Sequence, residues 1–212
     1  MKVNEIFYSI QGESSFMGFP CVFIRLTACD LRCTYCDTEY AFYEGQEMSI
    51  PEILQAIKAF QTRLVLVTGG EPMLHKSACD LFRNLLEHNY IVLVETGGHL
   101  SLRDVDPRVH KIMDIKCPSS GMDTLNDYNN INHLTPNDEV KFVVGDKNDF
   151  IWACEIIRRY ELPSRVGTVL FSPVYKKLPY SDLARWILDC GLPVRMQLQL
   201  HKVVWPDTPR GV

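Results

Sequence analysis

The chain has 212 residues, of which 46% are hydrophobic and 23% are charged, and its formal net charge is −4. These values lie close to globular averages, so they exclude disordered, collagen-like and low-complexity chains and favour a single domain over residues 1–212. Acidic and basic residues are interspersed, which argues against nucleic-acid binding, and no apolar run approaches the roughly 18 residues that span a bilayer. We therefore expect a cytoplasmic protein with neither nucleic-acid nor membrane partners.

Short β-branched runs alternate with amphipathic stretches along the chain. The hydrophobic runs predict strands at 22–27, 63–67, 91–95, 111–115, 139–144, 166–171 and 194–200. Between them, the period of the apolar residues predicts helices at 49–60, 77–89, 147–160 and 179–190. The first helix begins with Ser49 and Glu52 at capping-box spacing, and the last ends at Gly191, a typical C-cap.

The connections 96–110 and 116–138 are rich in Gly, Pro, Asn and Ser, and they are too irregular for full crossover helices. Most of the predicted strands are almost continuously apolar, which is typical of parallel strands that are covered on both faces. We therefore expect an α/β fold whose sheet forms a partial (β/α) barrel that is reduced in helices.

Polar or glycine-rich residues follow the predicted strands. They are Thr27 to Cys29, Thr68 to Glu71, Glu95 to Gly97, Asp114 to Lys116, Ser172 and His201. In parallel α/β folds, ligands bind at the carboxyl ends of the strands. The sequence therefore predicts that these groups converge on one rim of the sheet and form the active site there.

Cys29, Cys33 and Cys36 cluster directly after the first predicted strand. A reducing compartment disfavours structural disulfides, so the cluster indicates metal or redox chemistry. The spacing Cys-x3-Cys-x2-Cys, with no fourth cysteine nearby, fits a [4Fe-4S] cluster in which one iron lacks a protein ligand. A structural zinc site needs four ligands, and the nearest candidates, His75 and Cys79, are distant in sequence. An open iron favours catalysis, while a noncatalytic zinc-stabilised binding module is the alternative.

The cysteine loop resembles the signature of the radical S-adenosylmethionine (SAM) superfamily, in which the open iron holds the amino and carboxylate groups of SAM. Tyr35 matches the aromatic residue that precedes the last cysteine of that signature. The segment Thr68-Gly69-Gly70-Glu71-Pro72 resembles the glycine-glycine-glutamate segment of the superfamily. Glycine at such a turn lets the backbone approach a ligand without a side-chain clash.

A narrower resemblance covers nearly the whole chain. The segment EIFYSIQGESSFMGFPCVFIRLTACDLRCTYCDT closely resembles the 7-carboxy-7-deazaguanine synthase family of queuosine and 7-deazapurine biosynthesis, and the likeness continues to the terminal LQLHKVVWPDTPRGV. It implies conversion of 6-carboxy-5,6,7,8-tetrahydropterin to 7-carboxy-7-deazaguanine with loss of ammonia. The reaction in this family starts with a 5′-deoxyadenosyl radical from SAM and uses Mg²⁺.

The resemblance also implies roles for individual residues. Substrate contacts are implied for Ile10, Gln11, Gly12, Arg25 and Thr68, and SAM contacts for Tyr35, Cys36, Asp37, Gly70, Asp114, Ile115 and Lys116. The family often has Ser-Pro-Lys at 114–116, so Lys116 is the residue of this segment that matches the family. The strand end from Ser172 to Val174 is a further candidate for SAM contact.

Three further residues have a structural alternative beside the implied role. Thr38 maps to the Mg²⁺ ligand, which is reasonable for a hydroxyl beside a hard cation, although helix capping is an equal alternative. Glu95 and His201 are candidates for proton handling, and each can instead serve a structural hydrogen bond. The role of Glu13 stays open.

The resemblance further implies a homodimer and an electron donor such as flavodoxin or ferredoxin. A second hypothesis keeps the cofactors but replaces the pterin by a protein partner, as in an activase of glycyl-radical enzymes. The Gln-Gly-Glu segment at 11–13 and Arg25, which lie before the cysteines, argue against an activase.

Overall fold

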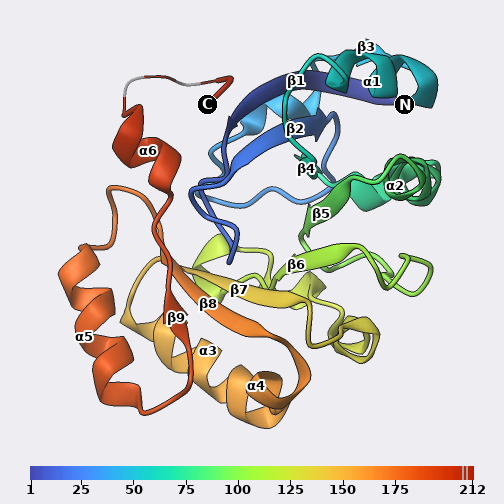
Figure 1. The fold of residues 1–212 in the computed structure, drawn as a ribbon. Helices are drawn as coiled ribbons and strands as arrows, with labels where there is room; N and C mark the ends of the chain where they lie inside the picture. Colours follow the sequence, from blue (N-terminus) through green and yellow to red (C-terminus); the bar gives the residue numbers. More distant parts are fainter. Residues whose placement is uncertain (207, 209) are drawn as a thin grey trace.

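The computed structural model describes the whole chain except residues 207 and 209. Its centre is one curved sheet with the strand order β3-β1-β2-β4-β5-β6-β7-β8-β9 (Figure 1). The strands are β1 (Lys2–Ile10), β2 (Pro20–Leu26), β3 (Gln46–Glu47), β4 (Leu64–Gly69), β5 (Ile91–Thr96), β6 (His110–Asp114), β7 (Glu139–Val144), β8 (Thr168–Pro173) and β9 (Arg195–Met196). β1 pairs antiparallel with β2 and β3, whereas the neighbours from β2 to β9 pair in parallel.

The predicted helices are confirmed with slightly different ends. The α-helices are α1 (Ile50–Ile57), α2 (Ala78–Glu87), α3 (Lys147–Arg159), α4 (Leu162–Arg165), α5 (Tyr180–Cys190) and α6 (Leu200–Val204), of which α4 and α6 were not predicted. Ser49 and Glu52 form the predicted capping box of α1, and Gly191 ends α5 with a φ of 65°. In the described chain, α1 and α2 lie on one part of the outer face of the sheet and α3 to α5 on another (Figure 1).

The two irregular connections are confirmed as well. Between β6 and β7 the described chain forms the 3-10 turns Pro118–Ser120, Asp123–Leu125 and Tyr128–His133 in place of an α-helix. The buried Asn130 joins the two connections, because its amide bonds to the backbone of Gly98, Leu100 and Leu102. The expected partial barrel with missing helices is therefore the observed architecture.

The predicted strand 194–200 is wrong over most of its length. Only Arg195–Met196 pairs with β8, and the backbone then bonds once more, from Gln197 to Phe171, before it leaves the sheet. The side chains of Gln197 and Gln199 turn instead to the carboxylate of Glu13, and the chain continues into α6. The alternating pattern of 194–200 thus reflects polar contacts with another segment rather than a long strand.

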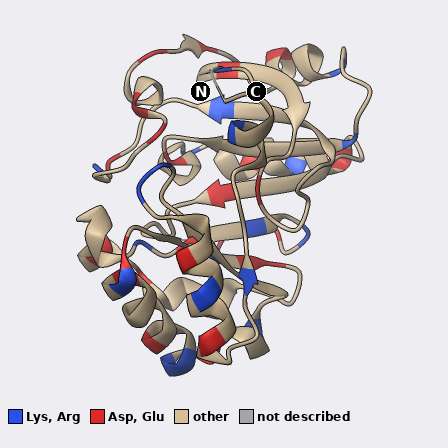
Figure 2. Ribbon diagram, turned by 90° about the vertical axis from the view of Figure 1, so that its left-hand side faces the viewer, with Lys and Arg blue, Asp and Glu red and all other residues tan. Residues whose placement is uncertain are grey.

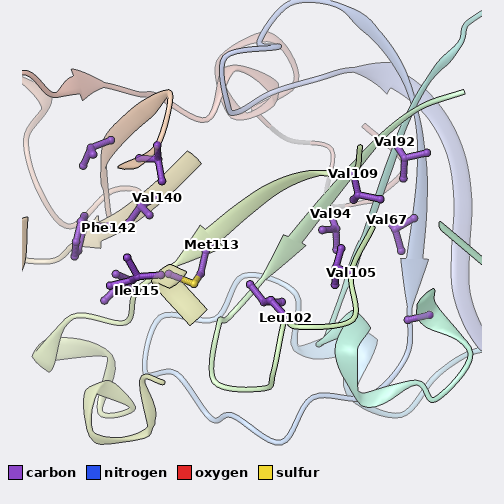
Figure 3. Close-up of a cluster of buried hydrophobic side chains, with 14 of the residues drawn as sticks. Val67, Val92, Val94, Leu102, Val105, Val109, Met113, Ile115, Val140 and Phe142 are labelled. Atoms are coloured by element: carbon purple, nitrogen blue, oxygen red, sulfur yellow. The ribbon is translucent and has the colours of Figure 1, made fainter. Parts of the chain in front are cut away.

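Side chains on the parallel strands alternate between two faces. Toward the helices, Val67, Val94, Met113 and Val140 belong to the main hydrophobic core (Figure 3). On the inner face a smaller buried cluster contains Cys21, Phe23, Leu64, Leu66, Leu93 and Ile112. The sheet is therefore buried on both faces, and positions beyond the inner cluster are left for polar groups at the strand ends.

The distribution of charge is mixed. Figure 2 shows basic and acidic residues side by side along the helices and strands. Among the described residues, no helix has the length and apolar character needed to cross a membrane.

Candidate active site

Six parallel strands each contribute one polar side chain to the site, five of them from the last two positions of the strand and Lys141 from the middle of β7. These residues are Arg25, Thr68, Glu95, Asp114, Lys141 and Ser172, and all of them line one cavity of about 450 Å³. Arg25, Thr68, Glu95 and Asp114 each follow an inward apolar residue by two positions, so the period of a β-strand places them on the same inner face. Cys29, Gly70, Gly97, Lys116 and His201 border the same cavity. The predicted convergence of the polar strand ends is thereby confirmed.

The three clustered cysteines also border this cavity. Cys29, Cys33 and Cys36 are partly buried free thiols. Their loop is anchored on both sides, because Asp30 lies 2.7 Å from Nε2 of His99 and the hydroxyl of Thr34 donates to the carbonyl of Ser119 at 2.7 Å. In the described chain, no group of three His, Cys, Asp or Glu side chains is arranged to hold a single metal ion.

The donor chemistry of this loop fits an iron–sulfur cluster. Three thiols from one anchored loop face one cavity, and thiolates are the ligands of such clusters. Burial raises the pKa of Cys29 to about 11 and also raises the pKa of Cys33. The free thiols of Cys29 and Cys33 are therefore protonated at neutral pH, and cluster binding has to release these protons.

The Thr68–Glu71 turn is joined to the start of the cysteine loop. A Cβ on Gly70 would lie 1.9 Å from the carbonyl oxygen of Ala28, so a side chain does not fit there. The amide of Glu71 donates to that carbonyl at 2.7 Å. The buried carboxylate of Glu71 accepts from the hydroxyl of Thr96 and from the amide of Gly97. Glu71 thus ties the ends of β4 and β5 together and fixes the glycine turn beside the cysteines.

Polar atoms without a protein partner lie at the predicted SAM site. Oδ1 of Asp114 is buried and has no hydrogen-bond partner among the described residues, while Oδ2 lies 3.1 Å from the ammonium of Lys116. Tyr35, Asp37, Gly70 and the segment from Ser172 to Val174 also line the cavity. An unpaired acceptor next to an ammonium fits a ligand with both donors and acceptors, such as SAM.

The side chain of Ile115, a predicted SAM contact, lies away from the cavity. Its side chain is 3% exposed, lies in the main hydrophobic core and does not line the cavity. Any contact of Ile115 with a ligand in the cavity would therefore involve its backbone.

The predicted substrate residues fall into two groups. Gln11, Arg25 and Thr68 line the cavity, and Nε2 of the buried Gln11 has no hydrogen-bond partner among the described residues. Ile10 and Gly12 are not among the lining residues. A Cβ on Gly12 would lie 2.1 Å from Nδ1 of His201, so this glycine allows the histidine ring to pack against the backbone.

Arg25 is held by its neighbour on β1. Its Nε lies 2.7 Å from a carboxylate oxygen of Glu5, which pairs directly opposite Arg25 in the β1–β2 ladder. The phenol of Tyr40 donates to the same carboxylate at 3.1 Å. Among the described residues, Glu5 bonds Nε and no side chain bonds the two terminal nitrogens of the guanidinium, which can therefore pair with a carboxylate in the cavity.

Glu13 and Lys141 form a buried ion pair on the wall of the cavity. Nζ of Lys141 lies 2.8 Å from Oε2 of Glu13. The amide of Gln197 donates to the same oxygen, and the amide of Gln199 donates to Oε1. Burial raises the pKa of Glu13, but the charge and hydrogen bond of Lys141 outweigh it, so the net pKa is lowered. Lys141 was not predicted, although its place between the apolar Val140 and Phe142 of β7 was an available signal.

The candidates for proton handling have shifted pKa values. Burial raises the pKa of Glu95, which accepts a hydrogen bond from Thr68 at 3.0 Å. Burial lowers the pKa of His201, so its imidazole is neutral at pH 7. Both side chains line the cavity, and both can exchange a proton with a bound ligand.

Residues of the C-terminal segment border the cavity as well. Lys202 in α6 lies 2.6 Å from Oδ2 of Asp37, next to the last cysteine of the loop, and Val212 lines the cavity. Thr38 also lines the cavity, and its side chain makes no capping hydrogen bond to the following 3-10 turn. Residues 207 and 209 of the terminal segment lie outside the described residues.

Comparisons with known proteins agree with this geometry. The Radical SAM superfamily matches residues 23–190. The 7-carboxy-7-deazaguanine synthases of Koribacter versatilis and Chlorobaculum tepidum are 42% and 46% identical to the chain, with 100% of the chain and 100% and 97% of the relatives covered. QueE from Escherichia coli has the same fold, with a TM-score of 0.76, 23% identity and 94% of both chains covered. The chain therefore belongs to the 7-carboxy-7-deazaguanine synthase family of radical SAM enzymes, which use a [4Fe-4S] cluster and SAM.

Proposed function

We propose that the protein converts 6-carboxy-5,6,7,8-tetrahydropterin to 7-carboxy-7-deazaguanine and releases ammonia. The observation that supports this most is the layout of the cavity. The three cysteines and Gly70 border it together with Gln11 and Arg25. A cofactor and a small carboxylated heterocycle can thus meet in one cavity.

Arg25 is the proposed partner of the substrate carboxylate. A guanidinium binds a carboxylate through two parallel hydrogen bonds, and in the described part of the chain Glu5 bonds Nε of Arg25 rather than its terminal nitrogens. Nε2 of Gln11, which has no partner among the described residues, and the hydroxyl of Thr68 are suited to the polar edge of a pterin ring. These three residues would orient the substrate over the inner face of the sheet.

The cofactors would bind on the cysteine side. When bound, the cluster and SAM supply a carbon radical that removes hydrogen from the substrate. Asp114 and Lys116 offer an acceptor and an ammonium for the polar groups of SAM, and Thr38 offers a hydroxyl for Mg²⁺. Phe23 and Leu66 line the same cavity, and such apolar walls limit the access of water to the reacting atoms.

Glu95 and His201 are the proposed groups for proton movement. Loss of ammonia requires removal of a proton from carbon and delivery of a proton to the departing nitrogen. A carboxylate with a raised pKa and a neutral imidazole can accept and return protons near neutral pH. A proton taken from carbon and returned to nitrogen leaves the enzyme unchanged at the end of the cycle.

The test is anaerobic incubation of the reconstituted protein with the pterin, SAM, Mg²⁺ and dithionite, followed by mass spectrometry. We expect a deazapurine product together with ammonia, and Cys33→Ala should abolish both product and cluster assembly. Cys79→Ala is the matched control, because Cys79 is a partly buried thiol that does not line the cavity. SAM cleavage without a deazapurine product would refute the proposal and favour an activase. A zinc-loaded protein without iron would favour the binding module.

The proposal extends to the cellular setting of the enzyme. A one-electron donor such as flavodoxin or ferredoxin would reduce the cluster in the cytoplasm, and the chain would act as a homodimer. Sedimentation of the reconstituted protein tests the dimer. Replacement of dithionite by reduced flavodoxin tests the donor.

A further inference from the structure

Lys141 occupies the centre of the charged groups in the cavity. Its side chain is 9% exposed, and its Nζ lies 2.8 Å from Glu13 and 3.8 Å from Asp114. Among the described residues, Nζ makes one hydrogen bond, to Glu13. Glu13 and Asp114 thus flank this ammonium on β7, Asp114 also pairs with Lys116 at 3.1 Å, and Glu95 lines the same cavity.

The charged groups around Glu95 come from several elements. Glu13 approaches from the loop after β1, Arg25 from β2 and Lys141 from β7, while Thr68 on β4 donates a hydrogen bond. Cys21 on β2 is also close enough to sense the charge of Glu95. Among these groups, Lys141 lowers the pKa of Glu95 most and Glu13 raises it most, after the effect of burial.

We propose that Lys141 is a positioning residue for the reaction, which fixes Glu13 on the cavity wall and keeps Glu95 available as a carboxylate base. This proposal rests on the proposed function, because it assigns Glu95 the task of accepting a proton. Lys141 acts through its two neighbours. It fixes Glu13, whose carboxylate accepts hydrogen bonds from Gln197 and Gln199 of the C-terminal segment.

Substitutions at the two members of the Lys141–Glu13 ion pair should shift the pKa of Glu95 in opposite directions. Lys141→Met removes a positive charge near Glu95, so the carboxylate is less stabilised and the pKa of Glu95 rises. Glu13→Gln removes a negative charge, so the pKa of Glu95 falls. Both variants break the same ion pair, and a role confined to folding predicts the same change for both. An opposite charge at close range typically shifts a carboxyl pKa by about one unit or more.

The experiment is a ¹³C NMR titration of the reconstituted enzyme with its cluster in the oxidised state, labelled at the side-chain carboxyls of glutamate. The resonance of Glu95 is assigned by its loss in Glu95→Gln. We expect the midpoint of Glu95 to move up by about one pH unit in Lys141→Met and down in Glu13→Gln, with Lys141→Arg close to the wild type. The acidic limb of the kcat/KM profile should move in the same directions.

Lys111 provides the matched control. It is a second buried lysine, on the neighbouring strand β6, and it pairs with the buried Asp138 at 3.0 Å outside the cavity. Lys111→Met should lower the melting temperature but leave the midpoint of Glu95 unchanged. If Lys141→Met does not fold, the test rests on the other two variants: the midpoint of Glu95 should fall in Glu13→Gln and stay near the wild-type value in Lys141→Arg.

The outcomes separate this proposal from the proposed function. Shifts of Glu95 in the same direction in both variants, or no shift in either, would overturn the role of Lys141. A wild-type enzyme that forms no deazapurine would overturn the proposed function, whatever the titration shows. A wild-type enzyme that turns over normally, together with Lys141→Met at full activity and an unshifted profile, would overturn the role of Lys141 alone.

Discussion

Arg25 depends on Glu5, a residue for which the sequence predicted no role. Glu5 binds Nε of Arg25 from the adjacent strand, and Tyr40 donates to the same carboxylate. Because a hydrogen bond between charged groups contributes about 1.5–3 kcal/mol, we expect Glu5→Gln to weaken substrate binding about tenfold or more. Anaerobic calorimetry with the pterin measures this. Asp80→Asn, which breaks an exposed ion pair on α2, is the control and should bind normally. Equal affinity in Glu5→Gln would contradict the role of Glu5.

His201 links stability to pH. Burial lowers its pKa below the ordinary value of 6.5, so between these two values the unfolded chain binds a proton that the folded chain does not bind. The free energy of unfolding therefore falls as the pH decreases through this window. We expect His201→Gln to lose less stability than the wild type over the same window, as measured by urea unfolding. His88→Gln, at an exposed position on the surface, should lose as much stability as the wild type over this pH window.

Some of the functional residues can be predicted from the sequence and others cannot. The cysteines, Gly70, Arg25 and Glu95 were identified because they lie in motifs or directly at strand ends. Lys141 was missed because it lies inside a strand, and only the curvature of the sheet brings it beside Glu13. Long-range pairs of this kind depend on the register of distant strands, which the local sequence pattern does not contain.

At the scale of elements, the contact between the β1–β2 loop and α6 is decisive. The backbone of Gly12 accepts a hydrogen bond from the amide of Leu200, and a Cβ on Gly12 would meet the ring of His201. We expect Gly12→Ala to displace the C-terminal segment and to lower the melting temperature and the activity. Limited proteolysis should show faster cleavage after residue 197.

A double variant distinguishes the clash between a Cβ at position 12 and the ring of His201 from other effects of Gly12→Ala. In Gly12→Ala with His201→Ala, the atom that the new Cβ would meet is gone. The double variant should therefore be more resistant to proteolysis than Gly12→Ala alone. Equal cleavage of both variants would show that the ring of His201 is not what Gly12 accommodates.

Elements with a strong local signal were predicted well, and those without one were not. The capping box of α1 and the glycine that ends α5 are local features, and both were found. The strand β1 was missed because its outer position leaves most of its residues partly exposed, without a continuous apolar run. The segment 194–200 was read as a strand because its alternation matches that period, but Gln197 and Gln199 point to Glu13 instead.

At the scale of the whole molecule, parallel strands bring the functional groups to one rim. β2, β4, β5 and β6 each follow an inner apolar residue with a polar side chain, and together with β7 and β8 they form six short segments, distant in sequence, that line a single cavity. This convergence was predictable, because it follows from the parallel order of the strands. The position of the C-terminal segment beside the cavity was not predictable, because it depends on single contacts such as Lys202 with Asp37.

The central claim is that Cys29, Cys33 and Cys36 leave one iron of the cluster free to bind SAM. The most direct measurement is electron–nuclear double resonance on the reduced, reconstituted protein with SAM that carries ¹⁵N in its amino group. The account predicts a ¹⁵N coupling to the cluster that disappears when unlabelled SAM is used. A cluster without any coupling to SAM, with every iron bound by a protein ligand, would contradict it.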